Sequence, residues 1–131
     1  MPEIMMSLGG YHFAVDTAAY QSLRRFDSYR WPTQERLTQT PASHYTGRGA
    51  PQINLRGVIY PHYKGGLEQI STLRGEAEKG EPMLLVTGRG EVLDRWVITF
   101  IGEEQSVFFS DGTPKKMEFR LTLQQYGEEI E

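Results

Sequence analysis

The residues best suited to catalysis or ligand binding are scattered along this chain. The three histidines, His12, His44 and His62, lie in separate segments and form neither the HxH nor the HExxH spacing of a local metal site. The sequence has no cysteine, which excludes disulfides, thiolate nucleophiles and metals held by thiolates. We therefore expect no catalytic residues, no metal site and no bound cofactor.

Carboxylates beside apolar segments are the next candidates, because a paired acid and base can catalyse hydrolysis. Asp94 and the pair Glu103-Glu104 are the acidic residues in such positions. A catalytic pair must converge on one pocket, and nothing in the sequence brings these groups together. The glycine-rich segments TGRGA (46–50) and TGRGE (87–91) lack the Lys-Ser/Thr of a phosphate loop. We expect solvated strand ends at the carboxylates and tight turns at the glycines.

The segment RRFDSYRW at residues 24–31 combines arginines with aromatic side chains. Such a mixture can stack on bases and pair with phosphates. The whole chain is acidic, however, with a formal net charge of −3 and no basic stripe. We favour a strand whose aromatic residues fill the core while its arginines face water or a partner. A small nucleic-acid-binding module that uses this segment is the alternative, and a hydrolase with an unrecognised site is a third hypothesis.

Length and composition predict one globular domain over residues 1–131. The chain is 38% hydrophobic, and no apolar run approaches the roughly 20 residues that cross a bilayer. The N-terminal segment carries Glu3 and lacks the basic region of a signal peptide. We expect neither a membrane nor a specific nucleic-acid sequence among the partners.

Alternating apolar residues predict strands over most of the chain. Residues 4–8 and 11–15 alternate on either side of Gly9-Gly10, which predicts a hairpin with Leu8 opposite Tyr11 and Met6 opposite Phe13. The aromatic residues and the following proline favour a strand at 20–31, although a helix is also compatible with this segment. Further strands are expected at 53–60, 83–87, 93–101, 107–110 and 116–124, with a turn at DGTPK, residues 111–115.

Two other features complete the expected fold. Residues 38–52 have the Pro, Gly, Ser and Thr content of an exposed loop. Residues 65–80 show apolar spacing of a helix, which Gly80 should end. Because residues 93–101 are apolar on both faces, we expect a central strand covered on both sides. The fold class is α+β: mainly antiparallel sheet, closed like a barrel or doubled like a sandwich, with one flanking helix.

Three stretches, taken together, resemble the phage P2 GpU tail protein family. They are SYRWPTQER at 28–36, LRGVIYPHYKGGLEQISTLRGEAEKGEP at 55–82 and VFFSDGTPKKMEFRLTLQQYG at 107–127. The resemblance implies a structural, non-enzymatic protein of a contractile P2-like tail, assembled in the bacterial host cytoplasm and located in the virion tail. It further implies a tail-tube-like fold and a homo-oligomeric ring, six-fold in symmetry, at an end of the tail tube. The implied partners are tail tube, tape-measure or baseplate proteins.

Most positions shared with the family are glycines, prolines and aromatic residues with ordinary structural roles. Arg30, Arg36 and Arg74 are the exceptions, because no local structural need accounts for their charges. An arginine can form two parallel hydrogen bonds to a carboxylate across an interface. We therefore expect these three residues to make subunit contacts, alongside exposed strand edges that pair between copies.

Overall fold

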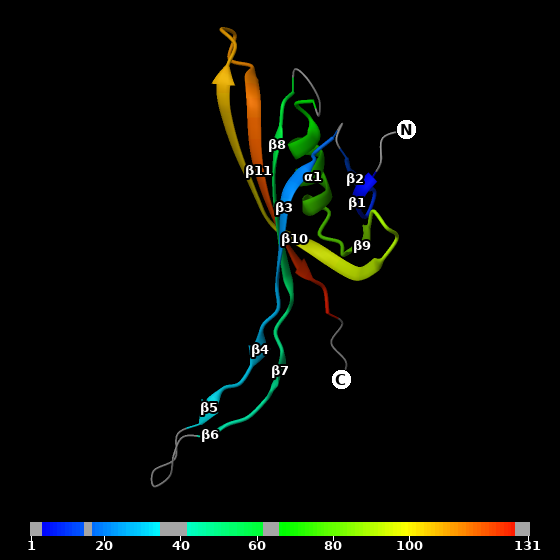
Figure 1. Ribbon diagram of the computed structural model, residues 1–131, viewed down its shortest axis with the longest axis vertical. Coiled ribbons are helices and arrows are strands. Elements are labelled where there is room, and N and C mark those ends of the chain that lie inside the picture. The colour runs from blue at the N-terminus through cyan, green and yellow to red at the C-terminus, as the bar shows by residue number, and fades with distance from the viewer. Residues whose placement is uncertain (1–3, 15–16, 35–41, 62–65, 128–131) are drawn as a thin grey trace.

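A seven-stranded antiparallel sheet organises the computed structural model, which describes residues 4–14, 17–34, 42–61 and 66–127. The strand order is β2-β1-β9-β10-β11-β8-β3, and helix α1 (Gln69–Glu78) lies on one face (Figure 1). The strands are β1 (Ile4–Leu8), β2 (Tyr11–Ala14), β3 (Tyr20–Phe26), β8 (Gln52–Ile59), β9 (Met83–Thr87), β10 (Val92–Phe108) and β11 (Pro114–Gln125). The expected α+β class is confirmed, and the sheet is open, since its end strands β2 and β3 belong to no common ladder within the described residues.

The N-terminal hairpin has the predicted register. Leu8 lies opposite Tyr11 and Met6 lies opposite Phe13. All four side chains are buried, because alternation places them on the face that packs into the core. The Tyr11 and Phe13 rings meet edge-on at a centroid distance of 4.9 Å. The hairpin therefore contributes an aromatic layer to the core.

The core lies between the sheet and α1. Alternate residues of β8 and β11 point into it, among them Leu55 and Leu121, and Ile70 and Leu73 enter it from the helix. The helix begins at Gln69, later than the sequence predicts, because Gly66 has a φ of 70° that no helical residue adopts. Gly80 follows the helix end with a φ of 65°, as expected. None of the described helices is long and apolar enough to cross a membrane.

Strand β10 corrects two predictions. It runs without a break over Val92–Phe108, so the separate strands expected at 93–101 and 107–110 are one element. The expectation that both faces are covered is wrong, because the Phe100 side chain is 52% exposed and only Trp96 is fully buried. The upper half of β10 extends beyond the helix as one limb of the β10–β11 hairpin (Figure 1). Phe100, Val107 and Phe108 on this strand therefore remain exposed among the described residues, whereas Ile98 and Ile101 still pack against the core.

The segment after β3 forms a projecting arm. Strand β4 (Tyr29–Arg30) pairs with β7 (Gly47–Arg48), and β5 (Thr33–Gln34) pairs with β6 (Ala42–Ser43), so the two limbs extend below the sheet (Figure 1). The exposed loop expected at 38–52 is thus largely the return limb of this arm, with residues 35–41 outside the described part. The tight turn expected at TGRGA is wrong, because this segment runs through β7. The TGRGE turn is confirmed by a hydrogen bond from Gly90 N to the Thr87 carbonyl.

The RRFDSYRW segment is extended, as favoured, but it is divided between the end of β3 and β4, and its aromatic residues do not fill the core. Phe26, Tyr29 and Trp31 are all exposed. Strand β3 is the last strand of the sheet, so its side chains have neighbours on one side only. Trp31 finds a partner within the arm, where its ring lies 5.1 Å from that of Tyr45.

Candidate assembly surfaces

The edges without a partner among the described residues include one edge of β3 and part of one edge of β10, besides the outer edge of β2. β3 pairs with β8 along one edge only. β10 pairs with β11 from Trp96 to Phe108, but its ladder with β9 ends at Trp96. The second edge of β10 therefore offers free backbone groups from Val97 onward. Such edges are ready templates for pairing with another chain.

The two free edges bound a continuous four-stranded part of the sheet, β10-β11-β8-β3. Every neighbouring pair in it is antiparallel. β3 therefore runs opposite to β10. A further copy could add its β3 beside β10 and continue the antiparallel pattern, because antiparallel addition needs opposite directions at the joint.

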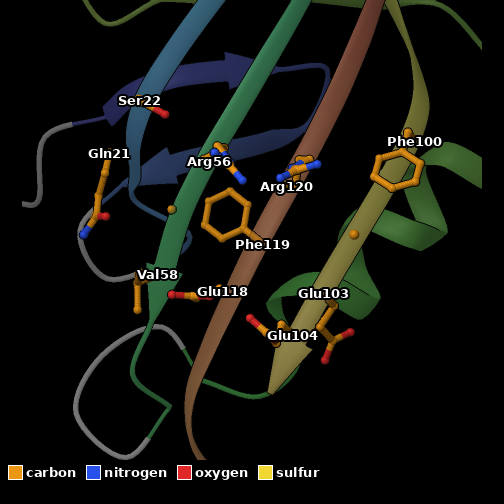
Figure 2. Close-up of a pocket in the computed structure, with 12 residues that line it drawn as sticks. Gln21, Ser22, Arg56, Val58, Phe100, Glu103, Glu104, Glu118, Phe119 and Arg120 are labelled. Atoms are coloured by element: carbon orange, nitrogen blue, oxygen red, sulfur yellow. The ribbon is translucent and has the colours of Figure 1, made fainter. Parts of the chain in front are cut away.

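The face of this sheet away from the helix carries a shallow pocket of about 580 Å³ (Figure 2). Arg56 and Arg120 stand side by side in it, because they are directly opposite each other on β8 and β11. Glu104 and Glu118 form a second directly opposed pair, on β10 and β11. Like charges in such positions destabilise a sheet. Neither arginine forms an ion pair with any residue that the structure describes.

Glu103 points to the other face and joins the helix to the sheet. Its Oε1 accepts a hydrogen bond of 2.6 Å from Arg74 Nη2, and its Oε2 accepts one of 2.7 Å from Gln105 Nε2. The hydrogen bond from Gln105, followed by the bond and charge of Arg74, lowers the pKa of the Glu103 carboxyl from its ordinary value. This group therefore anchors α1 against β10.

The structure places the predicted contact arginines on separate elements. Arg30 lies on β4 at the base of the arm, and its carbonyl accepts a hydrogen bond from Thr46 N. Arg74 lies on α1, with its side chain half exposed beside Glu103. Arg36 lies outside the described residues. Arg30 and Arg74 are not brought together, since the arm extends away from the helix (Figure 1).

The other chemical candidates also lie apart. Across the described ranges, no group of three or more His, Asp or Glu side chains is close enough to hold a metal ion. Asp94 occupies a bulge between β9 and β10, whereas Glu103 lies farther along β10. In the RRFDSYRW segment, Arg25 forms an ion pair with Asp27 at 3.2 Å and lies over the Trp96 ring. That arginine already has partners within the chain.

Sequence reasoning missed the free edge of β10 and the opposed arginines. The signal for the free edge of β10 was the apolar character of both faces at 93–101, because the apolar side chains of such a strand must be covered by other parts of the chain or by a partner. The second had no local signal. Arg56 and Arg120 are far apart in sequence, and only the ladder between β8 and β11 makes them neighbours.

Known proteins resemble this chain in sequence and in fold. Residues 9–128 match the family described as Phage P2 GpU. A protein of Halomonas phage phiHAP-1 described as a probable tape measure protein is 32% identical over 107 residues, which are 82% of this chain and 12% of that protein. The chain therefore spans only a small part of this relative.

The fold also occurs in solved structures, among them two of gene transfer agent particles. A chain in the virion of a native gene transfer agent particle superposes with a TM-score of 0.59 at 14% identity, covering 96% of this chain and 92% of that one. A chain in the tail of an empty particle of the same kind, with C6 symmetry, gives a TM-score of 0.57 at 15% identity and the same coverage. From the family match over nearly its whole length, this chain belongs to the Phage P2 GpU family and is a structural protein of the phage tail.

Proposed function

We propose that this tail protein forms a closed ring at an end of the tail tube, in which β3 of each copy pairs with the free edge of β10 in the next. The observation that carries the proposal is the four-stranded part of the sheet, β10-β11-β8-β3, in which the outer edge of β3 and the outer edge of β10 beyond Trp96 have no partner among the described residues. The contact is heterologous, because it joins two different surfaces, and such contacts close into rings. The role is structural rather than catalytic.

Strand direction supports closure. Because β3 and β10 run in opposite directions, the joint between copies is antiparallel, like every joint within the copy. The edges also carry exposed apolar side chains that pairing would cover, namely Leu23 and Phe26 on β3 and Phe100 on β10. Ring closure thereby removes both the free backbone groups and the exposed apolar edge residues.

The arrangement of layers sets the orientation of the ring. Helix α1 packs on one face of the sheet, so we place this face outside and the face with Arg56 and Arg120 toward the lumen. The gene transfer agent tail whose chain shares this fold has C6 symmetry, which supports a hexamer. The lumen would then present alternating pairs of arginines and glutamates to whatever passes through or ends there.

Neighbouring tail proteins are the proposed partners: the tail tube, the tape measure protein or baseplate components. The Halomonas phage relative, in which a related segment is part of a probable tape measure protein, supports proximity to the tape measure. We propose Arg30, Arg36 and Arg74 as contacts between subunits. For Arg74 this requires that the guanidinium keeps its hydrogen bond to Glu103 and directs its other N–H donors toward the neighbouring subunit.

Electron microscopy of the purified protein, with light scattering after size-exclusion chromatography, tests the ring. Leu23→Lys should reduce assembly to smaller species, since a lysine on an edge strand opposes pairing. Leu67→Lys is the matched control, because Leu67 is also exposed but lies before the helix, away from both edges. A ring that forms equally well from both variants would contradict pairing through β3.

A further inference from the structure

The far end of the β10–β11 hairpin exposes three consecutive apolar residues. Val107, Phe108 and Phe109 are 60%, 52% and 43% exposed. Figure 1 shows this hairpin end projecting past the helix. Contiguous exposed apolar side chains on a soluble protein mark a surface that another molecule covers. We call residues 107–109 the hairpin tip.

The backbone of the tip is strained. Val107 has a φ of 54°, a left-handed conformation that is an outlier for a β-branched residue. Within the described residues only one other non-glycine residue has a positive φ, namely Asp94 at 71°. Residues held in such sparsely populated conformations cluster at binding sites, where the surrounding structure fixes the direction of the side chain. The two positions therefore indicate two functional surfaces.

Asp94 borders a concavity of about 970 Å³ at the opposite end of the sheet. The residues that line it come from the base of the arm, strand β9, the start of β10 and the end of β11. Leu84 and Tyr126 line it and are both about half exposed. It thus offers apolar surface within a hollow, which the projecting tip of the same copy cannot reach.

The charges at the two surfaces are complementary. Arg30, Arg48 and Arg95 border the concavity, and none of them forms an ion pair with another described residue. The turn beside the tip carries Asp111, an exposed carboxylate that these arginines could bind. Lys115, whose Nζ lies 4.5 Å from the Phe109 ring centroid, supplies the opposite charge for Asp94. The negative and the positive group beside the tip therefore each have an oppositely charged counterpart at the concavity.

We propose that the hairpin tip of one copy seats in the concavity of a second copy. Tip and concavity lie toward opposite ends of the long β10–β11 hairpin, so the contact is head-to-tail and differs from the sideways pairing of β3 with β10. In the proposed ring it would join one ring to the next along the tail axis. Only the axial direction of the contact rests on the proposed ring, because two single copies can make the same contact.

Disulfide trapping tests the contact directly, since the chain has no cysteine of its own. Phe108→Cys is mixed with Leu84→Cys and, separately, with Leu67→Cys, whose side chain is 48% exposed against 46% for Leu84. The tip contact predicts at least about a ten-fold excess of the Phe108–Leu84 product, because groups held in contact reach effective concentrations in the mM range. Equal yields in the two mixtures, including none in either, would overturn the proposal.

A charge exchange tests the orientation of the tip. Asp111→Arg in the Phe108→Cys chain should lower the yield with Leu84→Cys by up to about five-fold, the effect of one exposed ion pair. Arg48→Asp in the Leu84→Cys chain should restore it. Unchanged yields throughout would overturn the orientation, and rings observed without trapped Phe108–Leu84 product would refute the axial contact while leaving the ring intact. Excess Phe108–Leu84 product in a chain that forms no rings would refute the ring and leave the contact between tip and concavity intact.

Discussion

Leu23 and Leu55 lie directly opposite each other on β3 and β8, yet Leu55 is fully buried and Leu23 is 45% exposed. Both face the helix side of the sheet, since opposed residues of a ladder point to one face. The difference arises because β8 has a strand on both sides at this level, whereas β3 is the end strand of the sheet among the described residues. This pair marks the place where the isolated chain stops covering its own apolar residues.

Alanine at these two positions should separate folding from assembly. Leu55→Ala should lower the free energy of unfolding by about 2–5 kcal/mol, because it leaves a cavity in the core. Leu23→Ala should change it by less than about 0.5 kcal/mol in the monomer, as a surface substitution. Urea unfolding of both variants measures the difference. A comparable loss at Leu23 would mean that β3 is covered within a single copy.

Gly57 and Gly75 should respond oppositely to alanine. A Cβ at Gly57 would meet the Phe119 ring and the Ala19 carbonyl closer than atoms can approach, whereas none lies within 4 Å of one at Gly75. Gly57→Ala should destabilise by about 1–3 kcal/mol, the effect of an overfilled core. Gly75→Ala should stabilise α1 by about 0.5–1 kcal/mol through helix propensity. Thermal unfolding of the two variants, compared with the unchanged chain, decides the sign.

The contacts of Glu103 should make stability depend on pH. The folded chain lowers the pKa of this carboxyl below the ordinary 4.5, so folding favours its ionised form. The resulting stability is present above the unfolded pKa and is lost as the pH falls through the lower folded pKa. Glu103→Gln should weaken this acid-side loss, and Gln105→Ala should weaken it partly, in urea titrations between neutral and acidic pH. The same loss in Glu103→Gln as in the unchanged chain would contradict the role.

Removing one arginine of the opposed pair Arg56–Arg120 should stabilise the isolated chain. Arg120→Gln should raise the free energy of unfolding by about 0.2–1 kcal/mol at low salt, the typical effect of a cross-strand pair. The gain should shrink in high salt, which screens repulsion between exposed charges. Arg89→Gln is the control, since Arg89 is highly exposed on a turn beside Glu91. Destabilisation by Arg120→Gln would show that the pair contributes favourably within the chain.

Features set by nearby residues were the predictable part of the fold. The register of the first hairpin follows from two alternating segments around Gly9-Gly10, and the buried alternation of β11 follows from a period of two. Helix α1 was recognised by its spacing, although its start was not, because the conformation at Gly66 cannot be read from composition. The family match extends over the same segments that carried the resemblance.

The site was less predictable, because exposure depends on which strands become neighbours. Arg30 was recognised, and it borders the concavity at the base of the arm. The hairpin tip was expected only as the start of a strand, and its exposure depends on β10 extending past the helix. The pairing of β10 with β9 stops at Trp96, and this long-range event creates the free edge.

The sequence by itself determined most of the strands, the helix and the family, because periodicity, turn residues and motif order are local properties of the chain. Only the tertiary structure decided which apolar residues remain uncovered and which charges become neighbours. Phe26 and Phe100 read as core residues in sequence, but they lie where the sheet has no further layer. Arg56 and Arg120 meet only through a ladder between distant strands. Strand order is set by the burial of the whole core, so these assembly surfaces could be found only once the chain was folded.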